Sequence, residues 1–209
     1  SCCYGLESLT ISEGVTSIGE SAFSYCSGLT EVAIPVTVTS IGNGAFNGCS
    51  GLRRVDIVDL AKWCAIEFGS NPLTYAKHLY LNGDEIRELV IPDGVTNIGK
   101  CAFSCCCGVT SVTLPDSVKI IGDSAFSGCD NLTSVFISPS VIRVGNRAFE
   151  GCGGLMKLVI SDGVTSIGDR AFIGCSALES IDIPNTVETI SSDSFVNVPA
   201  FRKKCCGNM

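Results

Sequence analysis

The sequence predicts an α/β repeat solenoid, a coil in which short units stack on one another. Two observations predict it, and both have a period of 23 residues. One is the motif Gly-x-x-Ala-Phe-x-x-Cys, and the other is an apolar frame, Leu-x-x-Val-x-Ile, which precedes the motif in each unit. A fixed period in the twenties is typical of solenoid proteins, whose units bury their apolar sides only by stacking. The motif is clearest at 99–106, 122–129, 145–152 and 168–175.

Each apolar frame predicts one short strand. Its last two apolar residues are two positions apart, so they face the same side of an extended chain. Pro follows four of the frames, and the strand ends there because Pro cannot donate a hydrogen bond to a neighbouring strand. The eight expected strands are Leu6–Ile11, Leu29–Ile34, Leu52–Ile57, Ile86–Ile91, Val109–Leu114, Leu132–Ile137, Leu155–Ile160 and Leu178–Ile183.

A segment Val-x-x-Ile-Gly follows each strand and leads to the Ala-Phe-x-x-Cys residues, for which we expect a short turn of helix. The residue after the Gly is Asn or Asp in several units, which suits the N-cap of that turn. The Phe of each unit supplies the bulk that fills the space behind the sheet. We expect one continuous core with Phe23, Phe46, Phe103, Phe126, Phe149 and Phe172 stacked along it.

We expect a single domain over residues 1–209, with two departures from the period. A variant repeat of 34 residues spans 57–90, and its segment 58–85 should protrude from the coil. Its aromatic residues should pack on the adjoining turns, with Tyr80 near the position that Phe takes elsewhere. Residues 183–209 form a degenerate repeat or cap, because the Gly, Ala and Cys of the motif are replaced there by Ser191, Ser194 and Val198.

Composition excludes several classes of function. A net charge of −7 argues against binding to nucleic acids or anionic membranes, which requires basic surfaces. No apolar run approaches the ~20 residues needed to cross a bilayer. No signal peptide is visible, and the first residues already fit inside a repeat, so we expect a piece of a longer chain.

Fourteen cysteines raise the question of disulfides or metal. Half of them share one repeat position, where in-register stacking leaves them ~4.8 Å apart, slightly too far for a disulfide. We therefore expect reduced, buried thiols in this column: Cys3, Cys26, Cys49, Cys106, Cys129, Cys152 and Cys175. The cluster Cys101, Cys105 and Cys107 lacks paired Cys-x-x-Cys spacing, so we expect no metal and leave open a local disulfide or simple drift at these positions.

Catalysis and cofactors are not expected. The one histidine, His78, would need an orienting partner to act as a base. The informative residues are instead those that alternate outward on the strands. Most are small or polar, but neighbouring units present an apolar row that suits either a contact patch or cross-strand packing. The candidate binding residues are Phe136, Val90, Thr113 and Val159, with Glu88, Ser134 and Lys157 beside them.

The pattern Ile-Pro-x-x-Val-x-x-Ile-Gly-x-x-Ala-Phe-x-x-Cys resembles the BspA-like (Treponema-type) leucine-rich repeats over residues 1 to about 205. The resemblance implies a right-handed coil with a parallel sheet on its concave face and short helical turns on the convex side. It also implies a bacterial protein that is displayed on the cell surface or secreted.

We accordingly expect a monomeric, non-enzymatic module that binds a protein or glycan, in adhesion or host interaction, on the concave sheet. The alternative is a structural spacer or stalk that projects another domain. The sequence does not name the ligand.

Overall fold

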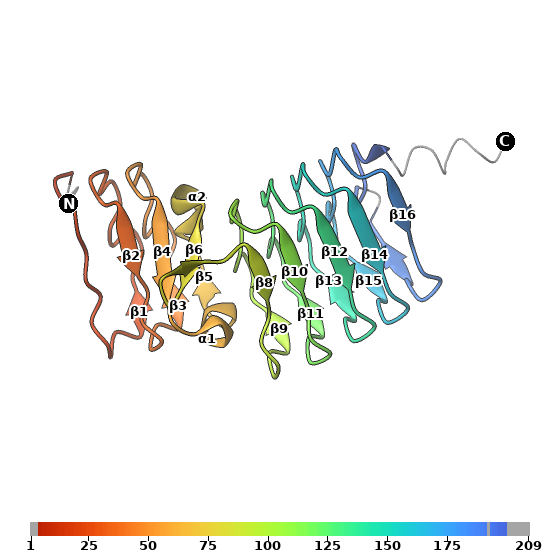
Figure 1. Ribbon diagram of the computed structural model, residues 1–209, viewed down its shortest axis with the longest axis horizontal. Coiled ribbons are helices and arrows are strands. Elements are labelled where there is room, and N and C mark those ends of the chain that lie inside the picture. Colours follow the sequence, from red (N-terminus) through yellow and green to blue (C-terminus); the bar gives the residue numbers. More distant parts are fainter. Residues whose placement is uncertain (1–3, 192, 200–209) are drawn as a thin grey trace.

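The computed structural model describes residues 4–191 and 193–199, which form a coil of stacked turns (Figure 1). Each regular turn contributes one strand to a front sheet and a shorter strand to a back sheet. The front sheet has two parts, with strand orders β2-β4-β6-β7 and β16-β14-β12-β10-β8. Its strands are β2 (Glu31–Ala33), β4 (Arg54–Ile57), β6 (Leu79–Leu81), β7 (Asp84–Glu85), β8 (Glu88–Val90), β10 (Ser111–Thr113), β12 (Ser134–Ile137), β14 (Lys157–Ile160) and β16 (Ser180–Asp182).

The back sheet is divided at the same place, into β1-β3-β5 and β17-β15-β13-β11-β9. Its strands are β1 (Ser17–Ile18), β3 (Ser40–Ile41), β5 (Glu67–Phe68), β9 (Asn97–Ile98), β11 (Ile120–Ile121), β13 (Arg143–Val144), β15 (Ser166–Ile167) and β17 (Thr189–Ile190). The coil therefore consists of an N-terminal stack and a C-terminal stack, and Figure 1 shows the break between β6 and β8. Sequence periodicity indicates the stacking but not this division.

Parallel pairing with a constant offset links neighbouring turns. In the C-terminal stack Val112 pairs with Val135, Val135 with Leu158 and Leu158 with Ile181, all of them inward-facing and buried. The predicted register is thus confirmed in this stack. The first expected strand, Leu6–Ile11, does not form, and this segment runs without a strand partner among the described residues.

The Ala-Phe-x-x-Cys segments are turns, and the expectation that each forms a turn of helix is wrong. Alternate N–H groups bond in two directions: Phe126 N donates to Ala148 O in the next turn at 2.8 Å, whereas Ala125 N donates locally to Gly122 O at 3.2 Å. A helix would use all of them within the segment. Positive φ at Ser124 also breaks helical geometry. The described helices are α1 (Leu60–Cys64) and α2 (Leu73–Ala76), both in the variant repeat.

The Asn and Asp residues that follow the repeated Gly connect turns instead of capping helices. Asp123 Oδ1 accepts the backbone N–H of Asn146 at 2.9 Å, and Asn146 Oδ1 accepts that of Asp169 at 2.8 Å. These side chains satisfy, turn after turn, an amide that the irregular backbone leaves without a backbone partner.

The core follows the predicted columns. Rings of successive turns in the C-terminal stack lie 5.2–5.4 Å apart and within 9° of parallel, from Phe103 to Phe195. Phe46 is buried, whereas Phe23 at the N-terminal end is only half-buried. The prediction is thus confirmed for the buried rings and is wrong for the depth of Phe23.

The cysteine column is reduced and buried from Cys26 to Cys175, as predicted. Thiols of regular turns donate to the carbonyl of a Phe in the preceding turn, as Cys129 does to Phe103 O at 3.1 Å and Cys152 to Phe126 O at 3.2 Å. Cys106, which follows the variant repeat, instead has the backbone of Leu79 as a partner. Burial raises the pKa of Cys106 and of Cys175 to about 12. A small apolar side chain with a weak donor suits this position because it fills the column and satisfies a carbonyl.

The variant repeat forms a turn of its own, and the expected protrusion is wrong. β5 pairs with β3, and β6 pairs with β4, so residues 58–81 complete one coil. The extra length is the hairpin of β6 and β7, which turns at Asn82 and Gly83 and covers the edge of β6. Tyr80 pairs with Asp56 on the sheet and does not take the position of a core Phe.

Two side chains of the variant repeat close the junction between the stacks. In regular turns the Ala carbonyl of the motif accepts the Phe N–H of the preceding turn. At Ala102 the donors are instead the indole Nε1 of Trp63, at 2.8 Å, and Nδ2 of Asn71, at 2.9 Å. Trp63 also packs edge-on against Phe68, with ring centroids 5.0 Å apart. The junction thus keeps a buried carbonyl paired although the repeat is interrupted.

Some predictions fall on residues outside the described ranges. These are the column position of Cys3 and the end of the C-terminal cap beyond Pro199. Within the described part of the cap, Ser194 takes the Ala position of the motif, since its carbonyl accepts the N–H of Phe172 at 2.9 Å. Its hydroxyl also donates to Gly168 O at 2.8 Å.

Candidate ligand-binding face

The candidate binding residues lie together on the exposed face of the front sheet. β8, β10, β12 and β14 each turn a central residue into the core and its neighbours outward. This alternation exposes 61% of Val90, 53% of Phe136 and 37% of Val159, and Thr113 is also exposed. The register pairs Val90 with Thr113 and Phe136 with Val159 on adjacent strands. The four residues thus lie on one exposed face, and we call them the apolar row.

A polar row runs beside it, two residues earlier on each strand. Glu88 pairs with Ser111, Ser111 with Ser134, and Ser134 with Lys157. Glu88 and Lys157 are exposed, and the two serines are half-buried. The row therefore has a carboxylate at one end and an ammonium at the other, so a ligand that lies across the strands meets opposite charges at its two ends.

The N-terminal stack has a different surface on its front sheet. The Arg54 guanidinium donates to both oxygens of Asp56, at 2.6 Å each, and lies 4.0 Å from the centroid of the Tyr80 ring. The hydrogen bonds to Asp56 raise the pKa of Arg54. The Arg54 cation is therefore already paired with a carboxylate and with an aromatic ring, the two kinds of group that a ligand would offer it.

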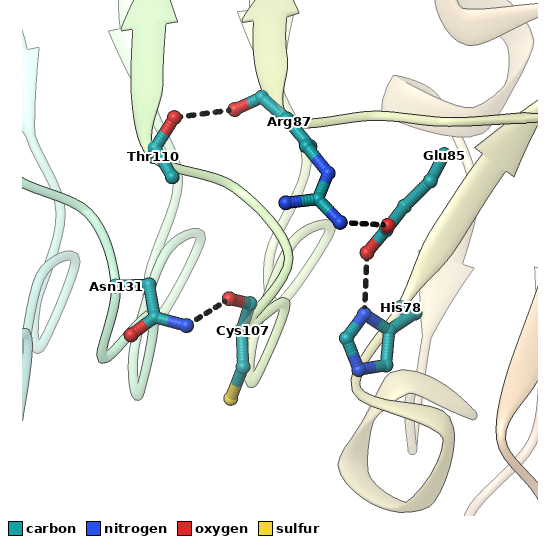
Figure 2. A network of polar contacts seen from close by, with 6 residues as sticks. All are labelled: His78, Glu85, Arg87, Cys107, Thr110 and Asn131. Carbon is teal, nitrogen blue, oxygen red and sulfur yellow. Dashed lines mark hydrogen bonds and ion pairs between the residues drawn. The ribbon is translucent and has the colours of Figure 1, made fainter.

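Figure 2 shows a polar network at the junction of the two stacks. His78 Nδ1 lies 2.6 Å from Glu85 Oε1, and Arg87 donates to Glu85 Oε2 at 3.0 Å. Burial would raise the pKa of Glu85, but the hydrogen bond from His78 and the charge of Arg87 outweigh burial and lower it. Sequence patterns gave no sign of this pair, since its members come from opposite ends of a hairpin.

The network orients a histidine ring, which is one requirement of a catalytic base, but the other requirement is a nucleophile within hydrogen-bonding distance. Among residues 4–191 and 193–199, no side chain bonds to Nε2 of His78. The network therefore ties the hairpin to β8, and Gly108 packs against it, since a Cβ there would stand 2.8 Å from Glu85 Oε1.

The back of the junction holds an open groove of about 940 Å³. It is lined by residues of β1, β3 and β5 together with the end of α1 and the turn before β9. Within the described ranges, no group of three or more His, Cys, Asp or Glu residues is placed to hold a metal ion. The same part of the chain contains no helix long and apolar enough to cross a membrane.

Comparison with known families agrees with this coil. The sequence matches six copies of the BspA type leucine-rich repeat region, over residues 1–71 and 74–202. The chain belongs to the BspA type leucine-rich repeat family. The resemblance seen in the sequence is thereby confirmed, and the match is interrupted at residues 72–73, within the variant repeat.

Two solved structures of bacterial proteins share the fold. One from Bacteroides ovatus is 27% identical, with a TM-score of 0.57 over 86% of this chain, and this chain spans 43% of its length. The pneumococcal vaccine antigen PcpA is 18% identical, with a TM-score of 0.56 over 88% of this chain and 59% of its own. A leucine-rich repeat protein of T. pallidum is 24% identical, with a TM-score of 0.47, and the match covers 92% of this chain and 77% of that one. No match was found among curated proteins.

Proposed function

We propose that this repeat region is a non-enzymatic binding module that holds a protein or glycan ligand against the exposed face of β8, β10, β12 and β14. The observation that carries the proposal is the apolar row on a sheet face whose other outward residues are mostly small or polar. Phe136, at 53% exposed, is its largest member. An aromatic side chain in the middle of a polar-rimmed patch is the type of residue that dominates binding energy at interfaces.

The fold itself does not require an exposed aromatic residue at this position. The inward residues Val135 and Ile137 already anchor β12 in the core, where both are buried. Pairing of Phe136 with Val159 adds some cross-strand packing, of roughly 0.2–1 kcal/mol for such pairs. Burial of the exposed part of the ring by a ligand would add apolar contact that the isolated coil lacks.

The partner class follows from the polar row and the charge of the chain. Glu88 and Lys157 offer one charge of each sign, and the serines between them offer hydroxyl donors and acceptors, which suit a protein surface or a sugar. The net charge of −7 disfavours nucleic acid. We place the module on the cell surface or in a secreted protein, as a monomer that acts in adhesion or host interaction, on the strength of its family.

The test begins with the wild-type protein, immobilised and screened against host matrix proteins and a glycan array. A ligand found there is titrated against wild type and Phe136→Ala, with folding checked by circular dichroism. We expect Phe136→Ala to weaken binding at least ~5-fold, which corresponds to ~1 kcal/mol, and to leave stability nearly unchanged. Changes to Glu88, Ser134 or Lys157 should have smaller effects.

Ile142→Ala is the matched control. Ile142 is 51% exposed, close to the value for Phe136, but it precedes β13 in the back sheet. We expect this variant to bind like wild type. Equal affinity of wild type and Phe136→Ala would remove the site from the apolar row. A coil that binds nothing in the screen, while a longer chain binds through another domain, would favour the spacer alternative.

A further inference from the structure

One turn of the coil carries a pair of thiols that the core does not use. Cys105 and Cys107 flank the column residue Cys106, which is buried, whereas both flanking residues are half-buried. Neither belongs to the side chains packed on the hydrophobic core, unlike Cys101 earlier in the same turn. The binding face described above lies on the front sheet, so this pair is independent of it.

The backbone brings the two cysteines together. Cys107 N donates to Cys105 O at 2.9 Å, which closes a three-residue turn around Cys106. Because consecutive Cα atoms are about 3.8 Å apart, a turn closed in this way holds its outer Cα atoms within the ~4.4–6.8 Å that disulfides span. The same turn recurs elsewhere, with N···O distances of 2.7–2.9 Å, at 25–27, 48–50, 151–153 and 174–176. The repeat itself therefore fixes the geometry, and only this turn has cysteine at both ends.

Both sulfur atoms lie against the same glycine of the next turn. Cys107 Sγ is 3.7 Å from Gly128 O, and Cys105 Sγ would lie 3.3 Å from a Cβ placed on Gly128. Because this residue is glycine, position 128 of the next turn places no side chain over the pair, and Ser104 Oγ lies 3.8 Å from Cys105 Sγ. The two half-buried cysteines thus have Gly128 as a common neighbour and are partly open to solvent.

Contacts outside the turn hold the pair in place. Asn131 Nδ2 donates to Cys107 O at 2.8 Å, and Figure 2 shows the Cys107 thiol pointing away from that bond. Cys105 N donates to Ser127 O at 2.7 Å. Burial raises the pKa of the Cys107 thiol, and the nearby Cys105 adds to that rise. The two thiols are thus positioned by backbone bonds that do not depend on the sulfurs.

We propose that Cys105 and Cys107 form a redox-active dithiol site, which is oxidised to an intramolecular disulfide by exchange with low-molecular-weight disulfides. The thiolate of one cysteine attacks a sulfur of the reagent R–S–S–R, whose S–S bond breaks and releases one thiolate, which is protonated to RSH. The second cysteine thiolate then attacks the mixed disulfide at the protein sulfur and releases the second RSH. The protein loses two electrons and two protons, and the reagent gains them.

The buried column takes no part in this reaction. Cys106 is fully buried, which closes it to the reagent and raises its pKa to about 12. Burial also raises the pKa of the half-buried Cys107, but Cys107 keeps access to solvent. Cys101 lies at the other end of the turn, and its carbonyl accepts Asn71 Nδ2 at 2.9 Å. A partly exposed disulfide that closes so short a loop is of the labile kind, and a dithiol reductant should reverse it readily.

The test exposes the native protein to oxidised glutathione, blocks remaining thiols after denaturation, and maps the disulfides by mass spectrometry. Wild type and the matched control Cys101→Ser should both show the peptide 101–119 lighter by two hydrogen atoms, with the link between residues 105 and 107. Cys105→Ser and Cys107→Ser should show no intramolecular link and should instead accumulate a mixed disulfide with glutathione. Circular dichroism verifies the fold of each variant.

Phenylarsine oxide, which binds two adjacent thiols together, provides a second readout without oxidation. Wild type and Cys101→Ser should bind one equivalent in the native state, and either serine variant of the pair should lose at least ~10-fold in affinity, about 1.4 kcal/mol. The proposal is overturned if Cys101→Ser abolishes the link, if wild type accumulates mixed disulfides at both cysteines, or if wild type and the Cys107→Ser variant bind the arsenical equally.

Discussion

Replacement of Phe126 by Ala should remove a central element of the stacked core. Phe126 is fully buried and lies between Phe103 and Phe149, with ring centroids at 5.4 and 5.2 Å and planes within 9° of parallel. Large-to-small changes of Phe in cores cost about 3–5 kcal/mol. Because two aromatic pairs are lost, each of about 0.5–1.5 kcal/mol, we expect a value near 5 kcal/mol, at the upper end of that range.

Phe23→Ala is the comparison that isolates burial from residue type. Phe23 is half-buried, and its ring lies 5.4 Å from that of Phe46 at a tilt of 30°. It therefore loses less apolar contact, and its replacement should lower the free energy of unfolding by clearly less than that of Phe126. The exposed Phe136 completes the series, with almost no cost expected.

Urea denaturation measures both variants, followed by far-ultraviolet circular dichroism and by the fluorescence of Trp63. The indole lies at the junction of the stacks, whereas circular dichroism reports on the whole coil, so coincident transitions are required before a single free energy is quoted. A loss below ~1 kcal/mol for Phe126→Ala, or a loss for Phe23→Ala as large as that for Phe126→Ala, would refute the stacked-core account.

Three further predictions concern the column, the junction and a close approach. Burial raises the pKa of Cys175 from 9.0 to about 12, so this thiol favours folding below pH ~9, and that contribution should be lost as pH rises toward 12; alkaline titration of stability checks this. Asn71→Ala and Trp63→Phe each remove one of two donors to Ala102 O. The double variant should therefore lose more stability than the sum of the two single variants, with a coupling of about 0.5–3 kcal/mol in a double-mutant cycle. Gly163→Ala should lower the midpoint of thermal unfolding, because a Cβ there would overlap a carbonyl oxygen of the preceding turn.

Much of the candidate site could be predicted from sequence because strand alternation is a local property. The spacing of inward residues in β12 and β14 fixes that Phe136 and Val159 point outward, and the constant period fixes that they are neighbours. The pairing of His78 with Glu85 was not predicted: Asn82-Gly83 signals a hairpin, but Glu85 pairs with Tyr80 on the strands, so its contact with His78 is a diagonal one that depends on side-chain direction. Whether the apolar row binds a ligand depends on a partner, which neither spacing nor burial identifies.

The sequence by itself determined the stacking, the register of regular turns and the columns of Phe126 and Cys129, because each turn meets a near-copy of itself and a repeated residue must occupy a repeated place. The tertiary structure decided three matters. The N–H of Phe126 bonds to the next turn, so the motif forms a turn and not a helix. The coil divides at the variant repeat, where Trp63 replaces a backbone donor, and Tyr80 lies on the sheet. Each of these outcomes depends on which group of a neighbouring turn a residue contacts, and a local sequence pattern carries no information on that choice.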